Sequence, residues 1–193
     1  EMRGYRLAES VIRSRARLTY TIASKLISGD GDAVSEGFVP LKGTLCEMAE
    51  LAMTFRRNRM AAGSMDFDLP EAEVVFDVEG GMQGIVRAER NVAHQLIEEF
   101  MLMANKTVAA HIFKRHVPSI YRTHEAPDPK KLKEFAEFVG SMGYRAGGME
   151  GGSSRELQRL LEKAEGKPEE LIINTLLLRS MKQAKYTVEN SGH

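Results

Sequence analysis

The sequence predicts a helix-dominated α+β unit that carries a few short strands and one hairpin. Three observations support this class. Apolar residues recur at helical spacing over long segments of the chain. Apolar and charged residues alternate over short segments, as they do in strands with one solvated face. No internal repeat and no clear domain boundary divides the 193 residues, a length that can bury roughly 70% of its unfolded surface in one core.

The first predicted elements are a strand and a helix. Residues 11–18 alternate, and Arg13, Arg15 and Arg17 would share one face of a strand. A helix over residues 19–28 is expected to end at Gly29, and residues 29–37 are rich in the Gly, Asp and Ser typical of loops. A long helix is then predicted from about residue 41 to its closing glycine, Gly63.

The middle of the chain changes period and then returns to helix. Between residues 65 and 87, apolar residues alternate with acids around Gly80-Gly81, which predicts a strand and a hairpin. The next helix, residues 91–116, is the clearest in the chain, and Pro118 follows it.

The C-terminal third is predicted to hold a short strand and three helices. The strand covers residues 119–127, and Asp128-Pro129 has the N-cap and first-turn proline of a helix that stops at Gly143. Ser153 and Glu156 have capping-box spacing at the start of a second helix. The last helix is predicted from near Pro168 to about Lys185.

Polar residues that share one face of the helix over residues 91–116 are the first candidates for chemistry. Asn91, His94, Glu98 and Asn105 need partners, because unpaired polar groups are costly in an apolar helix. One interpretation is a metal or substrate face, since a His and a Glu four residues apart can share a cation. The other is an internal hydrogen-bond network, which we favour.

Two further segments have a functional and a structural interpretation. Asp66 and Asp68, with Asp77 nearby, could hold magnesium or simply form the solvated side of a strand, and we favour the second. The Gly-rich segment GGMEGG, residues 147–152, lacks the Lys-Ser/Thr of a phosphate-binding loop, so we interpret it as a connector.

Basic and aromatic residues are interleaved in three places. As a helix, the end of the chain would place Arg179, Lys182 and Tyr186 on one face; the other two sets are Arg13, Arg15, Arg17 and Tyr20, and Tyr121, Arg122 and His124. Cations that follow phosphates, together with rings on which bases stack, are typical of single-stranded nucleic-acid binding. Composition alone favours the alternative, in which these residues only decorate solvated faces.

Charge and cysteine content limit the partners and the compartment. The 27 Lys and Arg balance the 27 Asp and Glu, so any polyanion must meet a local basic surface. The single cysteine, Cys46, cannot form an internal disulfide, which indicates a reducing, cytoplasmic setting. No apolar run reaches the ~20 residues that span a bilayer, so no membrane partner is expected.

Four stretches of the sequence, in this order, resemble the catalytic RNB domain of the ribonuclease II/ribonuclease R exoribonucleases. They are SVIRSRARLTY (10–20), AHQLIEEFMLMAN (93–105), YRTHEAP (121–127) and LLRSMKQAKYTVENSGH (177–193), the last closer to ribonuclease R. The resemblance covers essentially the whole chain. It implies magnesium-dependent, processive 3′-to-5′ hydrolysis of single-stranded RNA to nucleoside 5′-monophosphates, with no DNA partner and protein partners unknown.

The resemblance also assigns residues. Tyr20 and Tyr121 correspond to two aromatics of a base-stacking clamp, whereas Arg179 and Lys182 belong to a motif that lines or braces the RNA channel. The family's metal-binding aspartates precede the first stretch and its catalytic arginine follows the last. Residues 1–193 are therefore expected to be a partial RNB domain with no catalytic residue, no metal ligand and no bound Mg²⁺, inactive alone. The alternative is a non-catalytic helical module that binds RNA or a protein.

Overall fold

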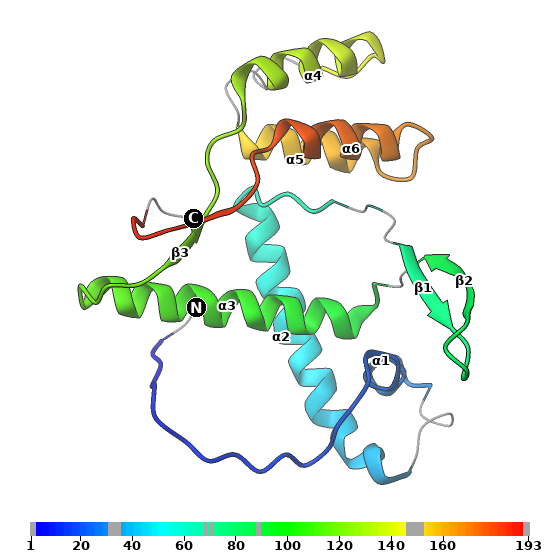
Figure 1. The fold of residues 1–193 in the computed structure, drawn as a ribbon, viewed down its shortest axis with the longest axis vertical. Coiled ribbons are helices and arrows are strands. Elements are labelled where there is room, and N and C mark those ends of the chain that lie inside the picture. Colours follow the sequence, from blue (N-terminus) through cyan, green and yellow to red (C-terminus); the bar gives the residue numbers. More distant parts are fainter. Residues whose placement is uncertain are drawn as a thin grey trace.

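The computed structural model describes residues 3–30, 36–67, 69, 72–87, 90–145 and 153–190, and within these ranges the chain is an α+β structure dominated by helices (Figure 1). Its elements in chain order are α1 Tyr20–Ser28, the 3-10 helix η2 Glu36–Leu41, α2 Lys42–Ala61, β1 Ala72–Phe76, β2 Met82–Arg87, α3 Val92–Lys114, β3 Tyr121–Thr123, α4 Pro129–Ser141, α5 Ser154–Ala164, α6 Glu170–Ser180 and β4 Lys185–Thr187. The predicted fold class is confirmed. No helix in these ranges combines the length and apolarity needed to cross a membrane.

Helices α1, α2 and α3 form one half of the molecule, where α3 crosses α2 and α1 packs beside the N-terminal end of α3. The centre of the crossing is made of small side chains, because Ala49 and Ala52 of α2 are buried with Leu96 of α3. Alanines allow two helix backbones to approach closely. Larger apolar side chains, among them Met48, Met53 and Phe100, pack around this centre. A buried ion pair, described below, joins the same two helices.

The other half is a layer of α4, α5 and α6 that lies above the α2–α3 crossing in Figure 1. Its core is leucine-rich: Leu157, Leu160 and Leu161 from one face of α5 meet Leu132, Phe135 and Val139 of α4 and Ile173 and Leu177 of α6. Fully burying each large apolar side chain contributes about 1.5–3 kcal/mol. Met65 and Phe67, from the segment after α2, pack against this core and connect the two halves.

The four strands found among the described residues form two separate antiparallel pairs. In the first, Val74 of β1 faces Ile85 of β2, and the register shifts between Val75 and Phe76. The turn includes Gly80, whose φ of 84° suits glycine, and the carboxylate of Asp77 accepts hydrogen bonds from the backbone N–H groups of Glu79 and Gly81. The predicted hairpin is thus confirmed. In the second pair, β3 and β4 join segments 60 or more residues apart.

Four sequence-based expectations about elements are wrong. Residues 65–67 and 69, which alternate like a strand, form none, so Asp66 does not lie on the solvated side of a strand. Residues 11–18 form no strand, because no described segment pairs with them. The last helix ends at Ser180 and not near Lys185, since residues 185–187 pair with β3. Ser153 caps α5 without a side-chain hydrogen bond, so the capping box is not formed. The Asp128 cap of α4 and the left-handed Gly29 after α1 are confirmed, while residues 147–152 lie outside the described ranges.

Candidate functional site

Tyr20 is the first residue of α1, and its ring stacks on the ring of His94 near the start of α3. Thr19 fixes the helix start, because its hydroxyl accepts a hydrogen bond from the N–H of Ile22 at 3.2 Å. The two ring centroids are 3.9 Å apart with an interplanar angle of 22°. Tyr20 is nevertheless 46% exposed. One face of the ring lies against His94, and close to half of the residue's surface remains accessible to solvent.

His94 is itself held by Asn91, the N-cap of α3. The Asn91 side-chain oxygen accepts from the N–H groups of Ala93 and His94. Depending on its tautomer, His94 Nδ1 either donates to Asn91 Oδ1 at 2.9 Å or accepts from the backbone N–H of Asn91 at 3.3 Å. In both cases Asn91 orients the imidazole ring. The predicted polar face is therefore a hydrogen-bond network here, as favoured from the sequence.

An ion-pair network lies next to this cap. Arg90 pairs with Asp66 at 3.1 Å and with Glu98 at 2.6 Å, and Arg56 of α2 pairs with the same Asp66 carboxylate. Burial alone would raise the pKa of Asp66, but the hydrogen bonds and charges of Arg56 and Arg90 outweigh it and hold that pKa below its ordinary value. The network fixes Arg90, the residue before Asn91, to α2 and α3.

A buried ion pair continues the network along α3. The Arg59 guanidinium donates to Glu99 through Nη2 at 2.5 Å and Nε at 3.1 Å, and Glu99 is only 3% exposed. The hydrogen bond to Glu99 raises the pKa of Arg59 above its ordinary value, against the opposing effect of burial. Both charges are thus satisfied. Asn105, the last member of the predicted polar face, is exposed.

The residues that the structure describes do not fit a magnesium ion. They contain no group of three or more Asp, Glu, His or Cys side chains placed to hold a metal. The Asp66 carboxylate forms ion pairs with two arginines, and the Asp77 carboxylate accepts hydrogen bonds from backbone N–H groups of its turn. Asp68 lies outside the described residues. The described side chains therefore offer no site at which a metal could take part in a reaction.

Tyr121 lies elsewhere and is buried. It begins β3, pairs with Thr187 of β4, and is 9% exposed. Its ring contacts Phe113 edge-on, with centroids 6.5 Å apart and an interplanar angle of 84°. Phe113 and His94, the α3 residues that the two tyrosine rings contact, are 19 residues apart, or about 28 Å along the helix axis at ~1.5 Å per residue. The structure therefore does not bring the two tyrosines together as one narrow clamp, and a role for Tyr121 in RNA binding stays a prediction.

Arg179 and Lys182 are not on one helical face, because α6 ends between them at Ser180. Lys182 and Lys185 both pair with Glu125, Lys182 at 2.9 Å. The hydrogen bond from Lys185, followed by that from Lys182, lowers the pKa of Glu125 to about 2. Arg179 is exposed and forms no ion pair with the described residues. Of these two cations, Arg179 is the more available to a phosphate.

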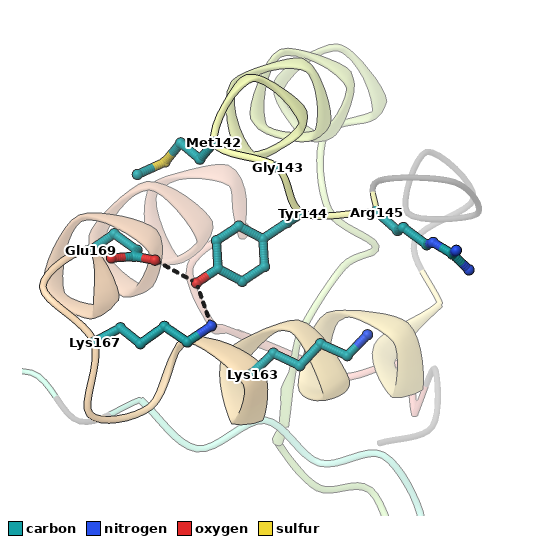
Figure 2. Close-up of a pocket in the computed structure, with 7 residues that line it drawn as sticks. All are labelled: Met142, Gly143, Tyr144, Arg145, Lys163, Lys167 and Glu169. Carbon is teal, nitrogen blue, oxygen red and sulfur yellow. Dashed lines mark hydrogen bonds between the residues drawn. The ribbon is translucent and has the colours of Figure 1, made fainter.

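One hollow that the sequence did not point to lies between the end of α4 and the turn from α5 to α6 (Figure 2). It has a volume of about 390 Å³ and is lined by Tyr144, Glu169, Lys163, Lys167 and Arg145, among others. The Tyr144 hydroxyl donates to Glu169 at 2.7 Å and accepts from Lys167 Nζ at 3.3 Å, while the same ammonium lies 5.0 Å from the ring centroid. These contacts join α4 to the start of α6, which gives the cluster a structural role.

Comparison with known proteins identifies the family. The RNB domain family model matches residues 1–193. The chain belongs to the RNB domain family. The chain is 43% identical over 192 residues to ribonuclease R of Aquifex aeolicus, which covers 100% of this chain and 27% of that protein. It is 35% identical over 190 residues to ribonuclease R of Escherichia coli, with coverages of 98% and 23%. This RNB sequence thus spans about a quarter of the length of its curated relatives.

A solved structure agrees with this RNB assignment at the level of the fold. Mycoplasma genitalium RNase R, in complex with ribose-methylated single-stranded RNA, superimposes with a TM-score of 0.78 at 24% identity. The match covers 90% of this chain and 27% of that one. The family resemblance drawn from four short motifs is therefore confirmed over the whole RNB segment.

Proposed function

We propose that this RNB segment works within a processive, magnesium-dependent 3′-to-5′ exoribonuclease that hydrolyses single-stranded RNA to nucleoside 5′-monophosphates. Support comes from the family match over residues 1–193 and from relatives named ribonuclease R. The RNase R of M. genitalium has been solved with single-stranded RNA and with double-stranded RNA. A cytoplasmic location, suggested by the single cysteine, is part of this proposal.

The observation that carries the proposal onto this chain is the exposed ring of Tyr20, held against His94. A ring fixed in orientation with one open face is what a base needs in order to stack. Such stacking contributes about 1–3 kcal/mol per base and depends little on sequence. We propose that Tyr20 stacks on a nucleotide near the RNA 3′ end and that Arg179, exposed after α6, neutralises a phosphate.

The chemistry is proposed to come from outside these residues. Because the described side chains form no carboxylate cluster for a metal, we propose that residues 1–193 alone bind RNA without cleaving it. In this proposal the described residues orient the RNA. Tyr20 provides a stacking surface, and Asn91 and His94 at the N-terminal cap of α3 support it. Magnesium belongs to the longer protein in this proposal.

A second candidate function rests on the same lack of a metal-binding carboxylate cluster among the described residues. A helical module without a metal site among its described residues could bind RNA or a protein without hydrolysing anything. The two candidates differ in whether the longer protein cleaves RNA.

The test uses single-stranded RNA labelled at its 5′ end, incubated with residues 1–193 or with the longer protein, each in magnesium or in EDTA. The proposal predicts a magnesium-dependent ladder shortening from the 3′ end with the longer protein and intact RNA with residues 1–193. Cleavage by residues 1–193 would overturn their proposed inactivity. Intact RNA in both reactions would favour the binding module.

A further inference from the structure

We infer that His94 is a positioning residue that holds the ring of Tyr20 in the orientation from which a base stacks on it, with Asn91 setting the orientation of His94. This inference rests on the proposed role of Tyr20 as a stacking surface. It adds a residue from a different helix to that surface and assigns the polar cap of α3 a function besides capping.

The rings of Tyr20 and His94 lie face to face. At a centroid separation of 3.9 Å and an angle of 22°, Tyr20 and His94 form a nearly parallel stack. His94 is partly buried, whereas Tyr20 is 46% exposed. The imidazole therefore covers one face of the phenol ring from the protein side. A base on the open face would extend the same stack, in the order base, Tyr20, His94.

His94 is held in place by Asn91. Its Nδ1 contacts Asn91 at 2.9 Å, and the Asn91 side chain is fixed in turn by the N–H groups at the start of α3. The preceding residue, Arg90, is held by Asp66 and Glu98. Residues from the segment after α2 and from α3 thus determine the position of a ring that α1 presents. No other described aromatic ring stacks on Tyr20.

Loss of the His94 ring is expected to weaken RNA binding only moderately. An unsupported side chain distributes over two or three staggered χ1 wells. If only the present orientation accepts a base, the competent fraction falls to about a third to a half, and the apparent affinity falls about two- to threefold by that fraction. Removing the Tyr20 ring itself has a larger effect, since about 1–3 kcal/mol of stacking corresponds to about 5- to 150-fold in affinity.

The test measures binding of a short single-stranded RNA with 2-aminopurine as its 3′-terminal base, by fluorescence, in EDTA so that no cleavage occurs. Residues 1–193 are compared with Tyr20→Ala, His94→Ala, His94→Phe and Asn91→Ser. NMR of ring-labelled tyrosine reports in parallel whether Tyr20 feels the ring of residue 94. His94→Phe keeps an aromatic ring, and Asn91→Ser keeps an N-cap while removing the amide contact to the imidazole.

The inference predicts that His94→Ala weakens binding about two- to threefold and shifts the Tyr20 resonance, while His94→Phe leaves binding close to that of the unaltered chain. Asn91→Ser is expected to fall between them. Should His94→Ala not fold, RNA binding by His94→Phe and Asn91→Ser is compared instead. The inference then predicts that Asn91→Ser binds RNA more weakly than His94→Phe does.

Two results would overturn the inference and leave the proposed function standing. One is a strong loss with Tyr20→Ala but unchanged binding with both His94 variants. The other is an equal loss with His94→Ala and His94→Phe, which would mean that an aromatic ring at this position does not matter. Unchanged binding with Tyr20→Ala would instead remove the proposed stacking surface, and the inference with it.

Discussion

The ion pair between Arg59 and Glu99 offers a quantitative test of how α2 and α3 are held together. Glu99 is 3% exposed and the Arg59 side chain 15%. In Arg59→Met the long side chain is kept and the charge removed, so a buried carboxylate loses its guanidinium partner. Breaking a buried pair in this way costs about 3–5 kcal/mol. At about 2–4 °C per kcal/mol for a chain of this size, the melting temperature should fall by about 6–20 °C.

The assay is urea unfolding followed by far-ultraviolet circular dichroism, with the free energy of unfolding compared at an unchanged m-value. Arg57→Met is the matched control, because Arg57 is exposed on the same helix and hydrogen-bonds only Thr54 among the described residues. Its free energy of unfolding should change by no more than about 0.5 kcal/mol.

A double variant distinguishes the contribution of the ion pair from the cost of leaving one buried charge without a partner. Arg59→Met with Glu99→Leu replaces both charges by apolar groups, and such replacements are often neutral or stabilising relative to the pair. We expect the double variant to recover most of the stability lost in Arg59→Met. The reasoning would be refuted if Arg59→Met were no less stable than Arg57→Met, or if the double variant were less stable than Arg59→Met.

Three further predictions follow from single contacts. Glu125 should titrate near pH 2 by NMR of its carboxyl carbon and move toward its ordinary 4.5 in Lys185→Ala; because its folded pKa is lowered, its contribution to stability is present above 4.5 and is lost as pH falls toward 2. Leu177→Ala should cost about 2–5 kcal/mol in urea unfolding, against about 0.5 kcal/mol for the exposed Leu178→Ala. Tyr20→Ala in the longer protein should lengthen the final RNA product on a sequencing gel, and an unchanged product would contradict the proposed stacking.

Local sequence patterns correctly predicted most of the helices and the hairpin, because neighbouring residues determine where these elements begin and end. Asp128 could be recognised as an N-cap because the cap, the first-turn proline and the apolar repeat are adjacent in the chain. The N-cap role of Asn91, which the sequence placed only on a polar face, came from the structure. The hairpin around Gly80-Gly81 is equally local. The helix over residues 42–61 differs from expectation mainly at its start, where a 3-10 helix precedes it.

The wrong predictions occur where pairing with a distant segment determines the secondary structure. The apolar repeat of the last helix continues past Ser180, but β3 pairs with residues 185–187 and so the helix stops. The alternation over residues 11–18 looks like a strand, yet a strand needs a partner that local pattern cannot supply. Pairing and burial then override propensity.

The candidate site shows the same division. Tyr20 and His94 were each recognised from the sequence as candidate functional residues. Their stacking could not be predicted, because the two residues are 74 positions apart and no local pattern indicates the contact. Glu98 pairs with Arg90 and Glu99 with Arg59, and these partners lie 8 and 40 residues away in the chain, so the local sequence does not reveal them. Tyr121 contacts Phe113 and pairs with Thr187 of β4, the element that the sequence predicted as helix.

The central claim is that single-stranded RNA lies on Tyr20. Photo-cross-linking tests it most directly: single-stranded RNA with 5-iodouridine near its 3′ end is irradiated on the protein in EDTA, and the modified peptides are identified by mass spectrometry. The account predicts an adduct on Tyr20 that disappears in Tyr20→Ala. Adducts confined to other regions, such as the hollow around Tyr144, would contradict it.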